Sequence, residues 1–294
     1  MAYTYMKIGA EDASDYSDAN NFTFQVNPTI VDSGMVTQRQ IKELPHQKIH
    51  MLIDQGGLKP RTFMLKGHLH GTDKITNLNT LANHIFETGM KRFYYANDRF
   101  FYCFGGDLKH TFQGGRTNFV DFVAALITPL PFAYDDTNAY ESWTIANATA
   151  TTINSSNDSG ASEGAFKNDG SAPSHIQTWT ITNVGAANIT KVELGDAAVS
   201  GSAVQGNKIT WEGTLAQNEV LKIYLFKVVS TEGIRMFKKL YYTVDDAFSG
   251  DRDFDGDEPP HITAGEANQS FSVKLTGNNG SSTVRADWRD AYWV

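Results

Sequence analysis

The sequence predicts a mainly β protein: a β-sandwich or barrel-like domain with one packed α-helix, followed by a second β-sandwich. Three observations favour this fold class. Apolar residues alternate with polar ones in many short runs, turn formers separate these runs, and only one segment has helical periodicity. Of the 294 residues, 40% are hydrophobic and 12% are aromatic, which is enough apolar surface for two cores and excludes global disorder.

The first region, residues 1–140, contains the predicted helix at about 74–87. Thr72 or Asp73 can cap it, and Gly89 stands where a helix commonly ends in the left-handed conformation. Its apolar residues recur at steps of three and four: Ile75, Leu78, Leu81, Ala82 and Ile85. The segments around it are expected to be extended, namely residues 22–26, 63–69, 92–95, 99–104 and 118–128.

A polar segment separates the two regions of the chain. Small polar residues and glycine dominate residues 148–172, and such a segment buries too little surface to offset the entropy of ordering. We therefore expect a linker or long loop over 141–174. The second domain, 175–294, shows short period-two sets separated by turn formers such as Gly206-Asn207. These sets are expected to bury Trp179, Trp211 and Trp288.

Charge and composition limit the function classes. The net charge is −8, so the chain lacks the basic footprint with which proteins grip a nucleic-acid duplex. No run of about 18 apolar residues is present, and the N-terminus lacks a secretory signal pattern, so synthesis in a cytoplasm without a membrane span is expected. Cys103, the single cysteine, lies in an aromatic run and is expected to be a buried thiol.

No catalytic residues are predicted. Gly160-Ala161-Ser162-Glu163-Gly164 matches the serine-hydrolase pattern, but no apolar strand precedes it and no helical period follows, so we interpret it as a chance match. His68 and His70 share one side of an expected strand without a third ligand at metal spacing, and are interpreted as polar strand residues. No cofactor-binding motif is present, and none is expected to be required.

The run from Asp251 to Glu258 is the segment whose residue types most resemble a binding site. Its alternating carboxylates Asp251, Asp253, Asp255 and Asp257, with glycine in the sixth position, match the first half of a calcium loop. An EF-hand is excluded because Ile262 occupies the twelfth position, where a glutamate is needed. A looser calcium loop and a solvated acidic turn both remain open.

The order of these elements resembles the distal tail proteins of bacteriophages with long non-contractile tails. The resemblance spans nearly the whole chain. It rests on short sequence segments that follow one another in the same order as in the family. In the first half these are residues 21–28, 62–67, the helix ending at Gly89, the hairpin 92–101, and residues 115–123, 128–132 and 135–136. In the second half, residues 179–185 and 286–293 resemble parts of the family's galectin-like sandwich. Residues 148–172 and 251–258 depart from the pattern.

The resemblance implies a non-enzymatic structural protein of the virion tail tip, assembled in the host cytoplasm. Its subunits would form a ring, in this family a hexamer, between a tail-tube protein and a tail-tip or baseplate hub protein. DNA would pass through the lumen without specific binding, which the acidic balance suits. Two alternatives are a carbohydrate-binding tail-tip protein that recognises host cell-surface glycans and a tail-tube subunit. An enzyme acting on cell-wall glycan lacks a defensible acid/base pair.

Overall fold

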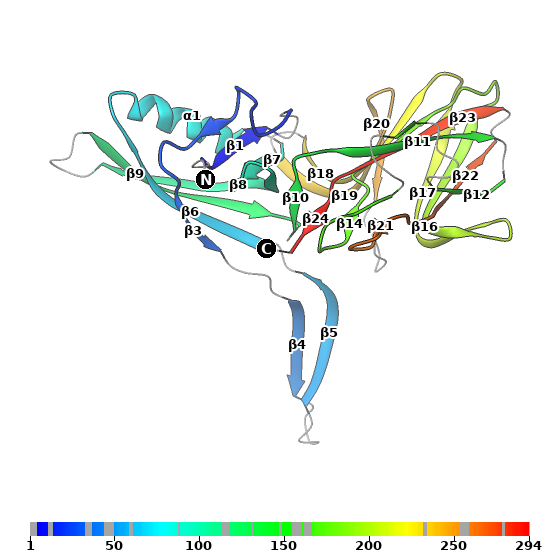
Figure 1. The fold of residues 1–294 in the computed structure, drawn as a ribbon, viewed down its shortest axis with the longest axis horizontal. Helices are drawn as coiled ribbons and strands as arrows, with labels where there is room; N and C mark the ends of the chain where they lie inside the picture. Colours follow the sequence, from blue (N-terminus) through cyan, green and yellow to red (C-terminus); the bar gives the residue numbers. More distant parts are fainter. Residues whose placement is uncertain are drawn as a thin grey trace. The chain divides into compact units, whose positions relative to one another are not determined.

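The computed structural model describes residues 5–10, 14–32, 37–43, 50–58, 61–87, 89–112, 118–130, 132–146, 149–154, 160–161, 166–231, 234–252, 259–277 and 280–293. The chain divides into two compact units, Met1–Asp136 and Thr137–Val294 (Figure 1). The mainly β fold is confirmed, with one helix among the described residues. Of the described residues, none forms a helix with the length and apolarity that a bilayer crossing requires.

The first unit contains the helix α1 (Lys74–Phe86), close to the predicted range. Its strands are β1 (Lys7–Ala10), β2 (Phe22–Thr23), β3 (Thr29–Asp32), β4 (Thr37–Glu43), β5 (His50–Leu58), β6 (Arg61–His70), β7 (Lys91–Tyr94), β8 (Arg99–Phe112), β9 (Phe119–Thr128) and β10 (Ala133–Asp135). Most of them pair in the order β2-β1-β7-β8-β9-β6-β3, and β10 also pairs with β8. Within the described part of the chain this sheet is open rather than a closed barrel.

Strand β8 joins the two halves of this sheet. Its first residues pair with β7, and from Phe104 onward it pairs with β9, with a register shift between Gly105 and Asp107. Helix α1 lies over one face (Figure 1) and buries Leu78, Leu81 and Ile85, whereas Ile75 is 43% exposed, contrary to the expected stripe. Ile75 belongs to the first turn, and the buried positions begin one turn later. The core beneath α1 includes Leu65, Leu69, Phe93, Phe101, Val120 and Phe122.

The second unit is a two-sheet β-sandwich, as predicted. One sheet has the order β13-β11-β23-β15-β18-β19-β20, the other β12-β22-β16-β17, and β14 pairs with β21. The bounds are β11 (Ala139–Ala146), β12 (Thr151–Ile153), β13 (Gly160–Ala161), β14 (Ser174–His175), β15 (Thr178–Thr182), β16 (Ile189–Ser200), β17 (Ala203–Leu215), β18 (Val220–Thr231), β19 (Ile234–Val244), β20 (Ala247–Arg252), β21 (His261–Ile262), β22 (Phe271–Thr276), β23 (Ser281–Trp288) and β24 (Ala291–Tyr292).

Aromatic rings fill the centre of this sandwich. Phe166 stacks on Trp143 and Phe271 with ring centroids 4.8 and 4.1 Å apart, and Trp288 lies 5.5 Å from it. Trp179, Trp211 and Trp288 are buried as the alternation predicts. Because both sheets contribute rings, their packing fixes the distance between the two layers.

The segment 141–174 differs from the polar linker that its composition predicts. Strand β11 is part of the larger sheet and places Trp143 in the core, and Phe166 lies at the core's centre. The unpredicted order has a local cause. Buried Asn168 donates from Nδ2 to the carbonyl oxygens of Ala172 (2.8 Å) and Ile262 (3.3 Å). A few buried aromatic and amide groups therefore order the described part of this polar stretch.

Candidate functional surfaces

The first unit has an open face on the side of its sheet opposite α1. Strand register places Val31, Met64 and Ala125 side by side in one row across β3, β6 and β9. Val31 is 46% exposed, and Met64 and Ala125 are half-buried. The next rows hold Lys66 beside Val123, His68 beside Asp121, and His70 beside Phe119. We call these residues the open face; they combine an apolar row with charged and aromatic groups.

The sheet also ends in two different edges, β2 and β3, among the described strands. Asp32 at the end of β3 forms a bidentate ion pair with Arg61, whose guanidinium lies over the ring of Phe63 at 5.1 Å. This pair fixes the end of the edge strand. Strands β4 and β5 pair with each other over most of their lengths and with no other described strand. An isolated two-stranded ribbon is only marginally stable in water, so a partner surface would stabilise it.

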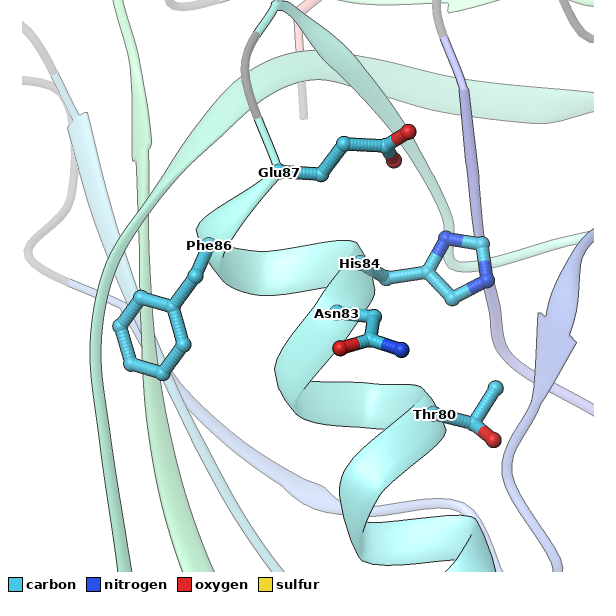
Figure 2. A pocket seen from close by; sticks show the side chains of 5 residues that line it. All are labelled: Thr80, Asn83, His84, Phe86 and Glu87. Carbon is cyan, nitrogen blue, oxygen red and sulfur yellow. The ribbon is translucent and has the colours of Figure 1, made fainter. Parts of the chain in front are cut away.

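A hollow of about 600 Å³ lies beside the last turns of α1 (Figure 2). Phe86 is 53% exposed there, and Figure 2 shows it pointing away from His84 and Glu87. Burial lowers the pKa of His84, and the Nδ1 of this ring has no hydrogen-bond partner among the described residues. Lys91 lies 2.5 Å from the Glu87 carboxylate and lowers its pKa. Thr80 and Asn83 complete the lining, which offers polar contacts without a nucleophile–base pair.

The calcium prediction stays a prediction. Asp251, on β20, forms an ion pair of 2.7 Å with Lys238, and Asp253, Asp255 and Asp257 lie outside the described residues. Within the described part of the chain, no group of three acidic, histidine or cysteine side chains is arranged to hold a metal ion. The one carboxylate of the four that is described is therefore already neutralised by a lysine.

The remaining candidates from the sequence are two histidines, the single cysteine and the serine-hydrolase match. His68 and His70 lie on the same face of β6 with ring centroids 6.2 Å apart, and both pack near Phe119. Cys103 is fully buried, and this burial raises the pKa of its thiol to about 12, so it is a poor nucleophile. Of the serine-hydrolase match, Gly160 and Ala161 form β13, and the serine lies outside the described residues.

Sequence reasoning missed an aromatic cluster on the outer face of the second unit's larger sheet. Tyr224 lies opposite Tyr241 across β18 and β19, with ring centroids 6.3 Å apart, and Phe248 lies 5.3 Å from Tyr241. Phe248 is 62% exposed. The signal was present in the alternation, because Tyr224 falls between the inward-facing Ile223 and Leu225 and must point outward.

Comparisons with known proteins place this chain beside phage structures. The Dit protein of phage SPP1, described as a paradigm of the hub adsorption apparatus in phages that infect Gram-positive bacteria, aligns over 97% of this chain and 98% of its own, with 12% identity and a TM-score of 0.48. A chain of the phage P2 baseplate in its activated conformation with calcium aligns over the same shares, with 10% identity and a TM-score of 0.40.

A chain of the phage p2 baseplate in its activated conformation with strontium gives 9% identity and a TM-score of 0.38, over 97% of this chain and 98% of its own. These three proteins come from a phage hub adsorption apparatus and from phage baseplates. Neither a protein-family model nor a curated protein matches the sequence.

Proposed function

We propose that this chain is a distal tail protein, a structural and non-enzymatic component of the phage tail tip that assembles through its first unit into a ring. The observation that carries this proposal is the open face together with two unlike sheet edges. Ring closure by head-to-tail contacts requires two different patches on each subunit, and β2 and β3 provide them. The exposed apolar row at Val31 supplies surface that an interface would bury.

In this role the ring, expected to contain six subunits, joins a tail-tube protein to a tail-tip or baseplate hub protein. The subunits then surround a passage through which DNA moves without specific binding. The net charge of −8 supports such a conduit, since a negative subunit repels phosphate groups. A tail-tube subunit is the second candidate, and it differs in outcome because tube subunits stack into long polymers whereas an adaptor stops at one or two rings.

The test uses the full-length protein in electron microscopy and native mass spectrometry. Rings with a single mass are expected for the natural sequence. Val31→Arg adds a charge to the exposed apolar row and should yield folded monomers, because a surface substitution costs the subunit itself little stability, within about 0.5 kcal/mol. Val184→Arg is the matched control, since Val184 is 50% exposed in the second unit and should leave rings intact. A natural protein that stays monomeric at micromolar concentration contradicts the proposal.

A further inference from the structure

The second unit carries a second kind of surface, the aromatic cluster defined by Tyr224, Tyr241 and Phe248. Its three rings lie on neighbouring strands with successive centroid distances of 6.3 and 5.3 Å. A fully packed core would bury such rings, yet Phe248 is 62% exposed and both tyrosines are half-buried. Adjacent partly exposed rings on a sheet offer an apolar platform to a ligand that presents C–H groups.

One cation belongs to this cluster. The Nζ of Lys227 lies 3.9 Å from the centroid of the Tyr224 ring and 5.7 Å from that of Tyr241. Within the described part of the chain, no carboxylate lies within ion-pair distance of it. Other cations of the same sheet are neutralised: Lys222 by Asp246 at 2.7 Å, Lys238 by Asp251 at 2.7 Å and Arg285 by Asp287 at 2.6 Å. The ammonium group of Lys227 therefore places a positive charge beside the rings of Tyr224 and Tyr241.

Hydroxyl groups surround this platform. Strand β15 pairs with β18 and presents Thr178 and Thr180 beside Tyr224 and Lys222. Thr243 lies opposite Lys222 on β19, is only 5% exposed, and its Oγ1 has no hydrogen-bond partner among the described residues. The aliphatic residues of the same strands point inward, as Leu221 and Ile223 do. The described outward residues of this surface are therefore aromatic rings, hydroxyl groups and charged groups.

We propose that this cluster binds an acidic saccharide, whose charge is a carboxylate or a phosphate. The C–H face of a sugar ring would stack on Tyr241 and Phe248, the acidic group would pair with Lys227, and sugar hydroxyls would exchange hydrogen bonds with the threonines. The same sheet contains a natural comparison. Arg285 lies over the ring of Tyr140 at 4.1 Å, but the Asp287 carboxylate accepts hydrogen bonds from its Nε and Nη2 and neutralises its charge. The site does not depend on ring assembly.

The test measures binding of the full-length protein by isothermal titration calorimetry. The probes are polygalacturonate oligomers, a poly(glycerol phosphate) teichoic acid, neutral dextran and polyglutamate. We expect binding to at least one of the two acidic saccharides, with affinity falling at least about tenfold in Lys227→Gln and in Phe248→Ala. Lys227→Arg keeps the charge and should retain binding, and Tyr140→Ala is the control that should leave it unchanged.

The two acidic saccharides distinguish a carboxylate from a phosphate ligand, and binding to either supports the proposal. Binding to neither acidic saccharide, or equal binding to dextran, would overturn it. Equal binding to polyglutamate would also overturn it, in favour of an acidic protein partner. Thermal melting of each variant identifies loss of fold, and Lys227→Arg supplies the folded comparison. The mass of the same samples reports ring assembly separately, so the failure of one proposal is distinguishable from the failure of the other.

Discussion

Asn168 shows how a single polar side chain orders the second unit. The residue is completely buried, and its amide donates to two carbonyl groups while its Oδ1 accepts from the backbone N–H of Gly170 at 3.0 Å. Asn183 repeats the arrangement, with Nδ2 donating to the carbonyl oxygens of Ala187 and Leu215 at 2.9 Å each. Each amide satisfies backbone groups at the ends of strands, where no ladder partner is available.

His175 predicts a pH dependence of stability at the residue scale. It lies on β14 opposite His261 of β21, and the ring centroids are 6.1 Å apart. Desolvation, with a smaller contribution from His261, lowers the pKa of His175 from 6.5 to about 3. The Asp196 carboxylate lies 3.6 Å from Nδ1 of His261. Below pH 6.5 the unfolded chain therefore binds a proton that the folded chain refuses, and stability falls as pH falls toward 3.

The measurement is the slope of melting temperature against pH between neutral and about pH 4. His175→Gln removes the titrating group, so we expect a shallower slope than in the natural protein, whatever the change in absolute melting temperature. His110→Gln is the control, because His110 is exposed and meets solvent in both states. An identical slope in His175→Gln and the natural protein would show that the desolvated imidazole does not control the acid limb.

Helix α1 depends on one close approach at the element scale. A side-chain carbon on Gly105 of β8 would lie 1.9 Å from the carbonyl oxygen of Ile85, so only glycine lets the helix rest on this strand. Gly105→Ala should force the helix outward and lower the free energy of unfolding by about 1–3 kcal/mol. Gly106→Ala is the matched control, since its added carbon would meet only ordinary contacts, the nearest at 3.4 Å from Ile127.

Denaturant unfolding of both variants, followed by circular dichroism, checks this prediction. Loss of stability in Gly105→Ala with little change in Gly106→Ala is the expected pattern. Equal effects in both variants would mean that the cost comes from the altered backbone freedom of the strand and not from the contact with α1.

The sequence predicts those elements whose burial is periodic. The helix follows from the spacing of Leu78, Leu81 and Ile85, and strand β9 from its continuous apolar run ahead of Pro129. Strand β11 was missed because Glu141 occupies an inward position and is completely buried, which breaks the apolar alternation around Trp143. The mostly polar composition of residues 141–174 therefore predicted a linker, although Trp143 and Phe166 in this segment are buried.

The candidate surfaces could be predicted only in part, for a related reason. Alternation shows that Tyr224 points outward, but its neighbour Tyr241 comes from strand pairing that the sequence does not define. The same holds for the open face, where Val31 meets Met64 through the register of β3 against β6. Surfaces made by several strands need register, and register depends on packing of the whole sheet.

At the scale of the whole molecule, two units with separate cores predict two unfolding transitions. The described core of the second unit contains residues from Ala139 to Trp288 and none from the first unit. In differential scanning calorimetry we expect Gly105→Ala to lower one transition and Asn168→Ala to lower the other. A single transition that both variants shift equally would show that the units unfold as one cooperative body.

The location of the indole rings has a practical consequence. All five tryptophans, residues 143, 179, 211, 288 and 293, belong to the second unit, and four of them are buried there. Intrinsic emission excited at the red edge of the absorption band therefore comes from that unit alone, while the first unit contributes only tyrosine and phenylalanine. The protein thus carries a native optical label on one half, with which unfolding or ligand contact there can be followed without any attached dye.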